Sequence, residues 1–259
     1  MAGATVFPEG LESSLTYFSH VLHLSVMVLN MPRTARIVIP HLPHHVTQRG
    51  NNRHDIFFTS DDYTCYLECL REECERFDVR VIGYCLMTNH VHLIAIPKTE
   101  GGLAKAVGRT HWRYTQYVNR LHGRSGHLWQ NRFFSCTLDE HHGWTALAYV
   151  ERNPVRARMV RVPWRYRWSS AGAHVGEADR SGLLDLQWWR REWNPAAWRK
   201  EIRTAQEESN VNQLRSHTRT GRPLASDRFI ARVEARLGRR LRPNPIGRPK
   251  KKATKGGRK

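Results

Sequence analysis

The chain has 259 residues, with 42 Lys and Arg against 23 Asp and Glu, and a formal net charge of +19 at pH 7. This length allows one domain of ordinary size with appendages. Such an excess of positive charge says little about the fold, but it favours a polyanionic partner, of which nucleic acid is the commonest. No apolar run approaches the roughly 18 residues that a membrane-spanning helix needs.

The first 30 residues are moderately apolar, but no basic segment precedes this stretch and no small-residue cleavage site follows it. We therefore do not expect a signal peptide. At Met31 the chain becomes basic and then strand-like. We expect residues 1–30 to be an N-terminal extension outside the core, and Met31 to be the functional start.

From Met31 the pattern alternates between strands and helices. An aspartate at 61 or 62 can cap the first helix, Gly123 can end the second, and three residues separate the two middle strands, which is hairpin spacing. The expected elements are a strand over 44–50, a helix over 63–77, strands over 79–86 and 90–96, a helix over 103–122 and a strand over 127–138.

This β-α-β-β-α-β order is the split βαβ arrangement of ferredoxin-like folds. The predicted fold class is therefore α+β, a ferredoxin-like antiparallel sheet with both helices on one face. The other face is left open. Residues 139–157 predict a helix that can pack there, with two acidic residues at its start and Pro154 as its terminator. Tyr149 and Asn153 are four residues apart and so share one face of this helix.

The strand over 90–96 carries His90 and His92 one residue apart. Side chains alternate along a strand, so these two imidazoles project from the same face with Cα atoms about 6.5 to 7 Å apart. Val91, Leu93 and Ala95 then face the two covering helices. We expect the tyrosine helix to dock over the two histidines and complete a site.

The chemistry of such a site is coherent. Two neutral imidazoles and an amide oxygen can hold a divalent cation and leave positions open for substrate oxygens. A tyrosine hydroxyl can then attack a phosphodiester as a nucleophile. The resulting phosphotyrosine bond keeps the energy of the broken bond for later rejoining. The pattern favours strand transfer without ATP over simple hydrolysis.

Four segments between residues 31 and 174 resemble the REP-associated tyrosine transposases, a branch of the single-tyrosine HUH (insertion-sequence-200-like) transposases that act on single-stranded DNA. They are "MPRTARIVIPHLPHHVTQRGNNRHDIFF", "YCLMTNHVHLIAIP", "HGRSGHLWQNRFFSCTLDE" and "YVERNPVRARMV" with the following "YRWSSAGAH". By this resemblance His90 and His92 are metal ligands, Tyr149 is the nucleophile that becomes 5′-phosphotyrosine-linked, and Asn153 takes the position of the third ligand.

The resemblance also implies the cofactor, partner and location. The cofactor is Mg²⁺ or Mn²⁺, and the partner is single-stranded DNA with hairpin repeats. The protein is expected in the bacterial cytoplasm, associated with the nucleoid, as a monomer or a homodimer. Five cysteines without a CxxC pair agree with free thiols in a reducing compartment.

Several residues have competing interpretations. Tyr114 and Tyr117 are rival nucleophiles, but they lie on a helix expected behind the sheet. Cys65 and Cys69 have helical spacing and are interpreted as core residues rather than metal ligands. The neighbouring pairs His44–His45 and His141–His142 are interpreted as contacts to DNA backbone or solvent, because sequence neighbours point apart on a strand.

DNA contacts are expected where arginines and aromatic residues interleave, because guanidinium groups position phosphates and exposed aromatics stack on unpaired bases. Trp129 and Phe133 are equally well explained as core residues. The expected nucleic-acid contacts are Gln48, Arg49, Arg53, Arg124, Arg132, Arg248 and Lys250.

We assign residues 31–174 to the catalytic domain and 175–211 to a helical connector. Residues 212–259 hold 16 Lys and Arg against two acidic residues and are expected to be a basic DNA-binding tail. This tail contains a predicted helix capped by Ser226 or Asp227, and a "GRPKKK" segment similar to an AT-hook. The alternative is a disordered tail that binds any phosphate backbone.

Two functions compete on this sequence. One is the metal-dependent tyrosine transposase, and the other is a domesticated, non-catalytic DNA-binding protein. Binding alone requires neither the two histidines nor the tyrosine and asparagine of the later helix, so their joint presence favours the enzyme. A zinc hydrolase is disfavoured, because neither HExxH nor HxE with PCxxC occurs.

Overall fold

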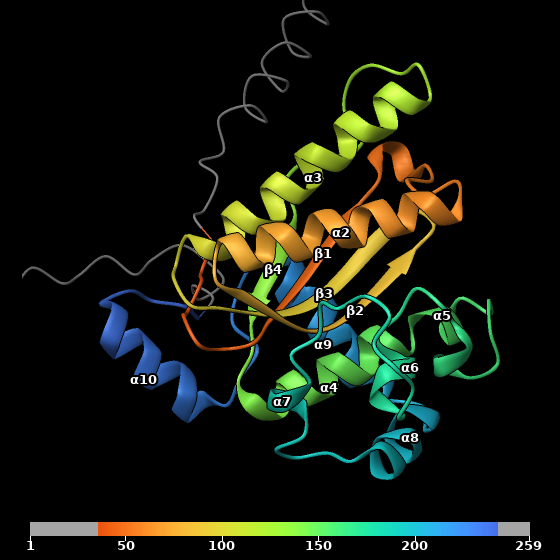
Figure 1. Ribbon diagram of the computed structural model, residues 1–259. Helices are drawn as coiled ribbons and strands as arrows, with labels where there is room; N and C mark the ends of the chain where they lie inside the picture. The colour runs from red at the N-terminus through yellow and green to blue at the C-terminus, as the bar shows by residue number, and fades with distance from the viewer. Residues whose placement is uncertain (1–35, 243–259) are drawn as a thin grey trace, which may run out of the picture. The chain divides into compact units, whose positions relative to one another are not determined.

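The computed structural model describes residues 36–242, so the expected N-terminal extension lies outside the described residues. A four-stranded antiparallel sheet has the strand order β2-β3-β1-β4 (Figure 1). Its strands are β1 (His44–Arg49), β2 (Val79–Met87), β3 (His90–Pro97) and β4 (Phe134–Thr137). Helix α2 (Ser60–Arg76) joins β1 to β2, and helix α3 (Gly102–Leu121) joins β3 to β4. The predicted ferredoxin-like fold class is therefore confirmed.

The strand register assigns side chains to the two faces of the sheet. In the β1–β3 ladder Thr47 lies opposite His92, and residues directly opposite each other in an antiparallel pair share a face. Val91, Leu93 and Ala95 alternate with the histidines and are buried against α2 and α3. The prediction that these three residues pack on the covering helices is confirmed.

The start of α2 differs from the sequence-based expectation. Thr59 is the N-cap, and its hydroxyl accepts a hydrogen bond from the backbone N–H of Asp62. The Asp62 carboxylate accepts from the N–H of Thr59 in return, at 2.8 Å. Asp62 therefore occupies the third position of a capping box rather than the cap itself.

The fourth strand is much shorter than expected. Only Phe134–Thr137 pair with β1, and the preceding residues form a loop beside the short 3₁₀ helix η1 (Asn51–Arg53). An isolated bridge joins Gly50 to Trp129, and the N–H of Gln130 donates to the carbonyl of Arg49 at 2.9 Å. Two stretches that are distant in the sequence thus lie side by side at one end of the sheet.

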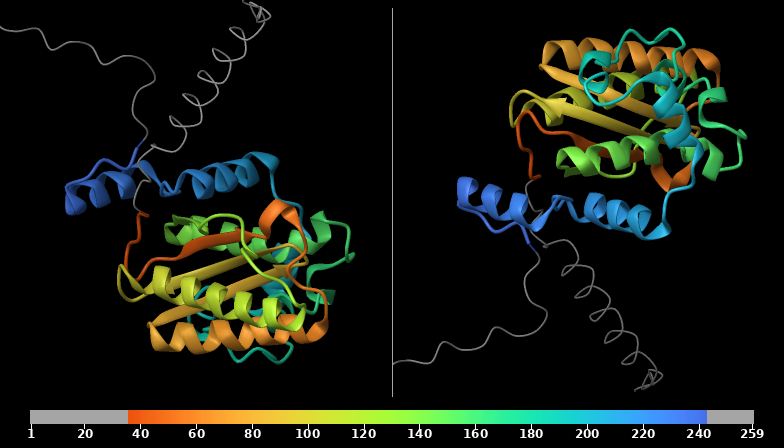
Figure 2. Two further views of the ribbon diagram at one scale, coloured as in Figure 1. Left: turned by 90° about the horizontal axis from the view of Figure 1, so that it is seen from above. Right: turned by 90° about the horizontal axis from the view of Figure 1, so that it is seen from below.

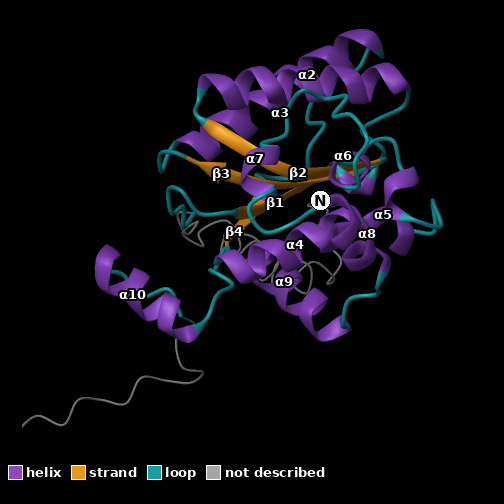
Figure 3. Ribbon diagram, turned by 60° about the horizontal axis from the view of Figure 1, so that its bottom comes forward, coloured by secondary structure: helices purple, strands orange, loops and turns teal. Residues whose placement is uncertain are grey.

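Helices α4 (Glu140–Glu151) and α9 (Glu208–Thr220) cover the second face of the sheet (Figure 3). A Cβ atom on Gly83 of β2 would lie 2.2 Å from Cδ1 of Leu147, so the missing side chain lets α4 approach the sheet closely. The expected boundary between connector and tail, at residues 211 and 212, falls inside α9. The assignment of residues 212–259 to DNA binding stays a prediction.

Short elements connect α4 to α9. They are α5 (Asn153–Arg156), η2 (Pro163–Arg165), α6 (Ala171–His174), α7 (Leu186–Trp189) and α8 (Pro195–Arg203). The carboxylate of Glu151 is fully buried and accepts hydrogen bonds from Ser170 Oγ at 2.5 Å, His174 Nδ1 at 2.6 Å and Trp198 Nε1 at 2.8 Å. Three partners satisfy this buried anion. They fix the C-terminal end of α4 against α6 and α8.

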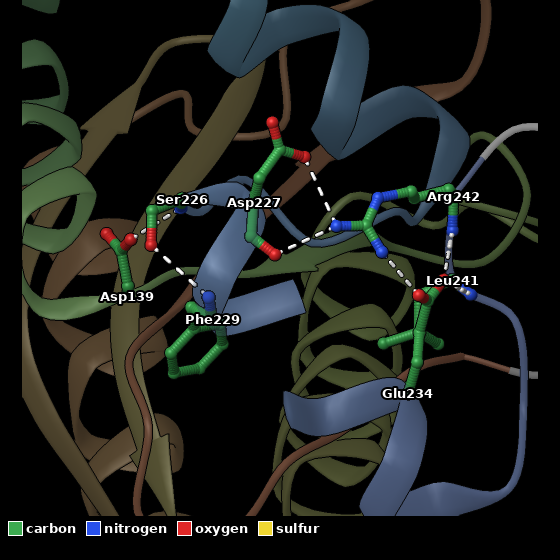
Figure 4. A network of polar contacts seen from close by, with 7 residues as sticks. All are labelled: Asp139, Ser226, Asp227, Phe229, Glu234, Leu241 and Arg242. Carbon is green, nitrogen blue, oxygen red and sulfur yellow. Dashed lines mark hydrogen bonds and ion pairs between the residues drawn. The ribbon is translucent and has the colours of Figure 1, made fainter. Parts of the chain in front are cut away.

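The last described helix is α10 (Asp227–Leu237), and its cap is Ser226, one of the two predicted alternatives. Figure 2 shows α9 and α10 on the side of the sheet opposite α2. The backbone N–H of Ser226 donates to Asp139 at the start of α4, at 2.9 Å, while Arg242 binds Glu234 and Asp227 (Figure 4). The start of α10 is thus hydrogen-bonded to the start of α4.

His44 links the segment before β1 to the sheet. It is fully buried, and its Nδ1–H donates to the carbonyl of Leu42 at 2.8 Å. Its Nε2 accepts from the backbone N–H of Ile39 and also contacts Thr137 Oγ1 at 2.9 Å. Burial lowers the pKa of His44 to about 4.

We expect this histidine to make the fold acid-sensitive between pH 6.5 and about 4. The unfolded chain binds a proton at His44 near pH 6.5, whereas the folded chain does so only near pH 4, so stability is lost as the pH falls through this window. The difference corresponds to about 3 kcal/mol. Urea unfolding between pH 7 and pH 4 should show a shallower decline for His44→Gln than for the wild type. Parallel declines would contradict the assignment.

Candidate metal and tyrosine site

His90 and His92 lie at the start of β3, on the sheet face that α4 covers. Their ring centroids are 5.0 Å apart and their ring planes are nearly perpendicular, at 81°. His90 is opposite Arg49 in the strand register and His92 is opposite Thr47, so all four share this face. His92 is 6% exposed and His90 is half-buried. The structure places the two imidazoles together, and their role as metal ligands stays a prediction.

Both imidazoles are neutral at pH 7. Burial is the largest cause, and it lowers the pKa of His90 to about 4 and that of His92 well below the ordinary value. The positive charges of Arg49 and Arg156 lower both pKa values further. A neutral imidazole keeps a ring lone pair, which is what binding a cation requires.

The Nδ1 atom of each histidine is already engaged. Nδ1 of His90 is 2.6 Å from Oδ1 of Asn89, an acceptor, so this nitrogen carries the hydrogen. Nδ1 of His92 is 2.9 Å from Nε2 of His45, whose ring is nearly parallel to that of His92, with centroids 5.1 Å apart. The Nε2 atoms of His90 and His92 are therefore the nitrogens that could bind a cation.

Tyr149 projects from α4 toward the histidines. Its ring centroid is 5.7 Å from that of His92 and 5.8 Å from that of His45, and it is nearly perpendicular to both. The guanidinium carbon of Arg156 lies 4.0 Å from the centre of the tyrosine ring. Nε of Arg215, on α9, donates to the tyrosine hydroxyl at 3.4 Å. Two imidazoles and two guanidinium groups thus surround a phenol that is 4% exposed.

The side chain of Asn153 makes its hydrogen bonds within the α4–α5 junction. Its amide nitrogen donates to the carbonyls of Tyr149, at 3.3 Å, and Val150, at 3.1 Å. Its amide oxygen accepts a hydrogen bond from Arg156. An amide oxygen has two lone pairs, so one remains for a cation. The role of Asn153 as a third ligand stays a prediction.

The rival tyrosines lie behind the sheet, as expected. Tyr114 is fully buried in α3 and its hydroxyl donates to the carbonyl of Ile56 at 2.6 Å. Tyr117 stacks on Tyr114, with ring centroids 5.9 Å apart. Both are therefore separated from His90 and His92 by the sheet itself.

The interpretation of His44 and His45 as contacts to solvent or DNA was wrong. They are 0% and 1% exposed. They do point apart, as strand geometry requires, and this alternation directs His45 toward the candidate site. The burial of His45 depends partly on Thr218 of α9, which lies 173 positions later in the sequence. Sequence neighbours alone therefore could not show it.

Gln48, expected to contact DNA, is 2% exposed. Its side-chain amide donates to the carbonyls of Gln130 and Asn131, at 3.0 and 2.9 Å. Gln48 therefore holds the loop before β4 rather than presenting a polar group on the surface. Arg248 and Lys250 lie outside the described residues. The remaining expected contacts, Arg49, Arg53, Arg124 and Arg132, are exposed, and their binding to DNA stays a prediction.

The aromatic residues of the loop before β4 belong to the core. Trp129 is half-buried and stacks on His111, with ring centroids 4.2 Å apart, while Phe133 is 6% exposed. Phe134, for which no sequence motif predicts a role, is 43% exposed. It lies opposite Thr47 in the β1–β4 ladder and so shares the sheet face of His92. An exposed phenylalanine on this face, two strands away from His92, is suited to stacking on a base.

Fold and site together define a class of protein: a ferredoxin-like sheet with two adjacent strand histidines, faced by a helical tyrosine. Residues 39–153 match the model of the family described as "Transposase IS200 like". The matched segment includes the whole sheet, both histidines and Tyr149. The sequence-based recognition is confirmed at the level of that family, which implies a DNA-cleaving domain in general terms.

Two solved structures are similar. A REP-associated tyrosine transposase bound to a REP hairpin is 17% identical, with 61% of this chain and 91% of that chain covered and a TM-score of 0.49. A protein from Deinococcus radiodurans R1, described as a candidate transposase, is 20% identical, with 47% and 97% covered and a TM-score of 0.32. No curated protein gives a significant match. Within residues 36–242, no helix combines the length and apolar character needed to cross a membrane.

Proposed function

We propose that this protein is a divalent-metal-dependent tyrosine transposase of the REP-associated kind. It would cleave single-stranded DNA at hairpin-forming repeats and rejoin it through a 5′-phosphotyrosine intermediate. The observation that carries the proposal is the juxtaposition of Tyr149 with His92, whose ring centroids are 5.7 Å apart, within a segment of the IS200-like family.

His90 and His92 fit a divalent cation, because both are neutral and both have Nδ1 engaged. Among the described residues, no three or more His, Cys, Asp and Glu side chains are grouped to hold a metal. The other ligands would then be the amide oxygen of Asn153 and oxygens of water and DNA. Imidazole is softer than the ligands that Mg²⁺ usually takes, so we expect tighter binding of Mn²⁺.

A bound cation would polarise the scissile phosphate and neutralise the charge that develops on it. In the cleavage step the hydroxyl oxygen of Tyr149 forms a bond to phosphorus, and the bond from phosphorus to the 3′ oxygen breaks. The phenol proton passes to water, and the leaving oxygen takes up a proton to become a 3′ hydroxyl. The reverse reaction with another 3′ hydroxyl rejoins the strand and frees the tyrosine.

Arg215 and Arg156 supply positive charge where this step needs it. Arg156 is packed on the ring of Tyr149, and Arg215 approaches the hydroxyl from the other helix. The Arg215 side chain is 51% exposed, so it can also reach a phosphate. A guanidinium in this position would stabilise both a phenolate and the negatively charged transition state.

Arg215→Ala is therefore expected to slow formation of the covalent adduct by about 10²- to 10³-fold, the cost of removing one preorganised donor. The ion pair of Arg215 with Glu208 is exposed, so we expect little change in the free energy of unfolding. Arg219→Ala, one turn further along α9, removes the same charge and serves as the control. Equal rates in the two variants would show that Arg215 contributes only general charge.

The proposal is tested with the full chain and single-stranded hairpin oligonucleotides in the presence of Mn²⁺ or Mg²⁺. The expected result is a covalent protein–DNA band on a denaturing gel, absent when the oligonucleotide is annealed to its complement. A non-catalytic DNA-binding protein would retard the hairpins on a native gel without forming such a band with any hairpin or metal.

A further inference from the structure

A buried series of hydrogen bonds leads from His92 through His45 to helix α9. Nδ1 of His92 is 2.9 Å from Nε2 of His45, and Nδ1 of His45 is 2.7 Å from Oγ1 of Thr218. The Thr218 hydroxyl lies 2.8 Å from the carbonyl oxygen of Leu214, one helical turn earlier. His45 and Thr218 are 1% and 3% exposed, so solvent does not compete for these atoms.

The last acceptor in this series of hydrogen bonds determines which atom donates in each bond. The carbonyl of Leu214 can only accept, so the single hydroxyl hydrogen of Thr218 is directed to it. The hydroxyl oxygen of Thr218 then accepts from Nδ1–H of His45. Nε2 of His45 has no hydrogen in that state, and it accepts from Nδ1–H of His92. The lone pair of His92 is thereby placed on Nε2.

We propose that His45 and Thr218 are positioning residues that hold His92 in the tautomer whose Nε2 can bind the divalent cation. This inference rests on the proposed function, because it concerns the metal site of that function. The orienting partner of a metal-bound histidine normally has this role, and its loss typically lowers metal affinity about 10- to 100-fold.

His90 and His92 are held by hydrogen bonds from different segments of the polypeptide. The partner of His90 is the adjacent Asn89, so that hydrogen bond is local. The partner of His92 is oriented by Thr218, which lies on a helix beyond the segment matched by the transposase family. Docking of α9 on the sheet would therefore be a condition for tight metal binding.

Three variants separate this role from simple packing. Thr218→Val keeps the size of the side chain and removes the hydroxyl, whereas Thr218→Ser keeps the hydroxyl. Cys136→Ala is the matched control, because Cys136 Sγ contacts the same hydroxyl at 3.2 Å but is not one of the hydrogen-bonded links between His92 and Leu214. Mn²⁺ affinity of each full-length variant is measured by titration calorimetry without DNA. We expect Thr218→Val to bind about 10- to 100-fold more weakly, and Thr218→Ser and Cys136→Ala to bind like the wild type.

A second measurement does not depend on metal. The ¹⁵N spectrum of the metal-free wild type, with His92 assigned by its loss in His92→Gln, should show hydrogen on Nδ1 and none on Nε2. Hydrogen on Nε2 of His92, or unchanged Mn²⁺ affinity in folded Thr218→Val, would overturn the inference. If the wild type binds no Mn²⁺, the proposed function fails. The inference is then still tested by the His92 tautomer, which should carry hydrogen on Nδ1 in the wild type and lose this preference in Thr218→Val.

Discussion

Tyr149→Phe is expected to abolish the covalent protein–DNA band, lowering its rate of formation by about 10⁴-fold or more, the scale on which loss of a nucleophile acts. The phenylalanine ring keeps the packing against His92, His45 and Arg156. The lost hydroxyl accepts a 3.4 Å hydrogen bond from the exposed Arg215. The free energy of unfolding should therefore change by less than about 1 kcal/mol. Rates are measured on denaturing gels with radiolabelled hairpins.

Tyr117→Phe is the matched control, because it removes a phenol hydroxyl from α3, on the opposite face of the sheet. It should form the adduct at the wild-type rate. A band that survives in Tyr149→Phe and disappears in Tyr117→Phe would reverse the assignment of the nucleophile. A band that survives in both would show that neither Tyr149 nor Tyr117 is the required nucleophile.

His90→Ala is expected to weaken Mn²⁺ binding by more than about 100-fold, because losing a residue that only hydrogen-bonds a metal ligand already costs up to that much. The covalent band should disappear as well. His90 is half-buried and its Nδ1 partner is the adjacent Asn89, so the fold should tolerate the change. Mn²⁺ titration without DNA and adduct formation with hairpins are measured on the same preparation.

The chain has 15 histidines, so a control must remove one that lies elsewhere. His141 is exposed at the start of α4 and meets this requirement. His141→Ala should bind Mn²⁺ and form the adduct like the wild type. Wild-type Mn²⁺ affinity in His90→Ala would show that the metal binds at a different place, whatever happens to the covalent band.

Local patterns were enough to predict the sheet and the placing of two site residues. The alternation of Val91, Leu93 and Ala95 with the histidines is a period of two, which a strand buried on one face requires. The same geometry directs His90 and His92 to one face without any knowledge of the rest of the chain. The helix around Tyr149 followed from its acidic start, but it ends at Glu151 rather than at the predicted terminator Pro154, which lies in α5.

The predictions that were wrong concern polar residues that the structure buries. Gln48, His44 and His45 are polar, and on composition alone each could be a surface residue. A distant segment supplies a hydrogen bond to each: the loop at 130–131 for Gln48, Thr218 for His45 and, beside the local Leu42 and Ile39, Thr137 for His44. The same long-range packing makes Trp129 a core residue that stacks on His111.

The sequence by itself determined which residues are spaced as strand or helix neighbours, and with them the two histidines, the tyrosine and the family. Tertiary structure alone decided that Arg215 reaches the hydroxyl of Tyr149 and that Thr218 orients His45 behind His92. The physical reason is the difference in sequence separation between local and tertiary contacts. Strand and helix periods relate residues two to four positions apart, whereas Thr218 and His45 are 173 positions apart and meet only through the docking of α9 on β1 and β4.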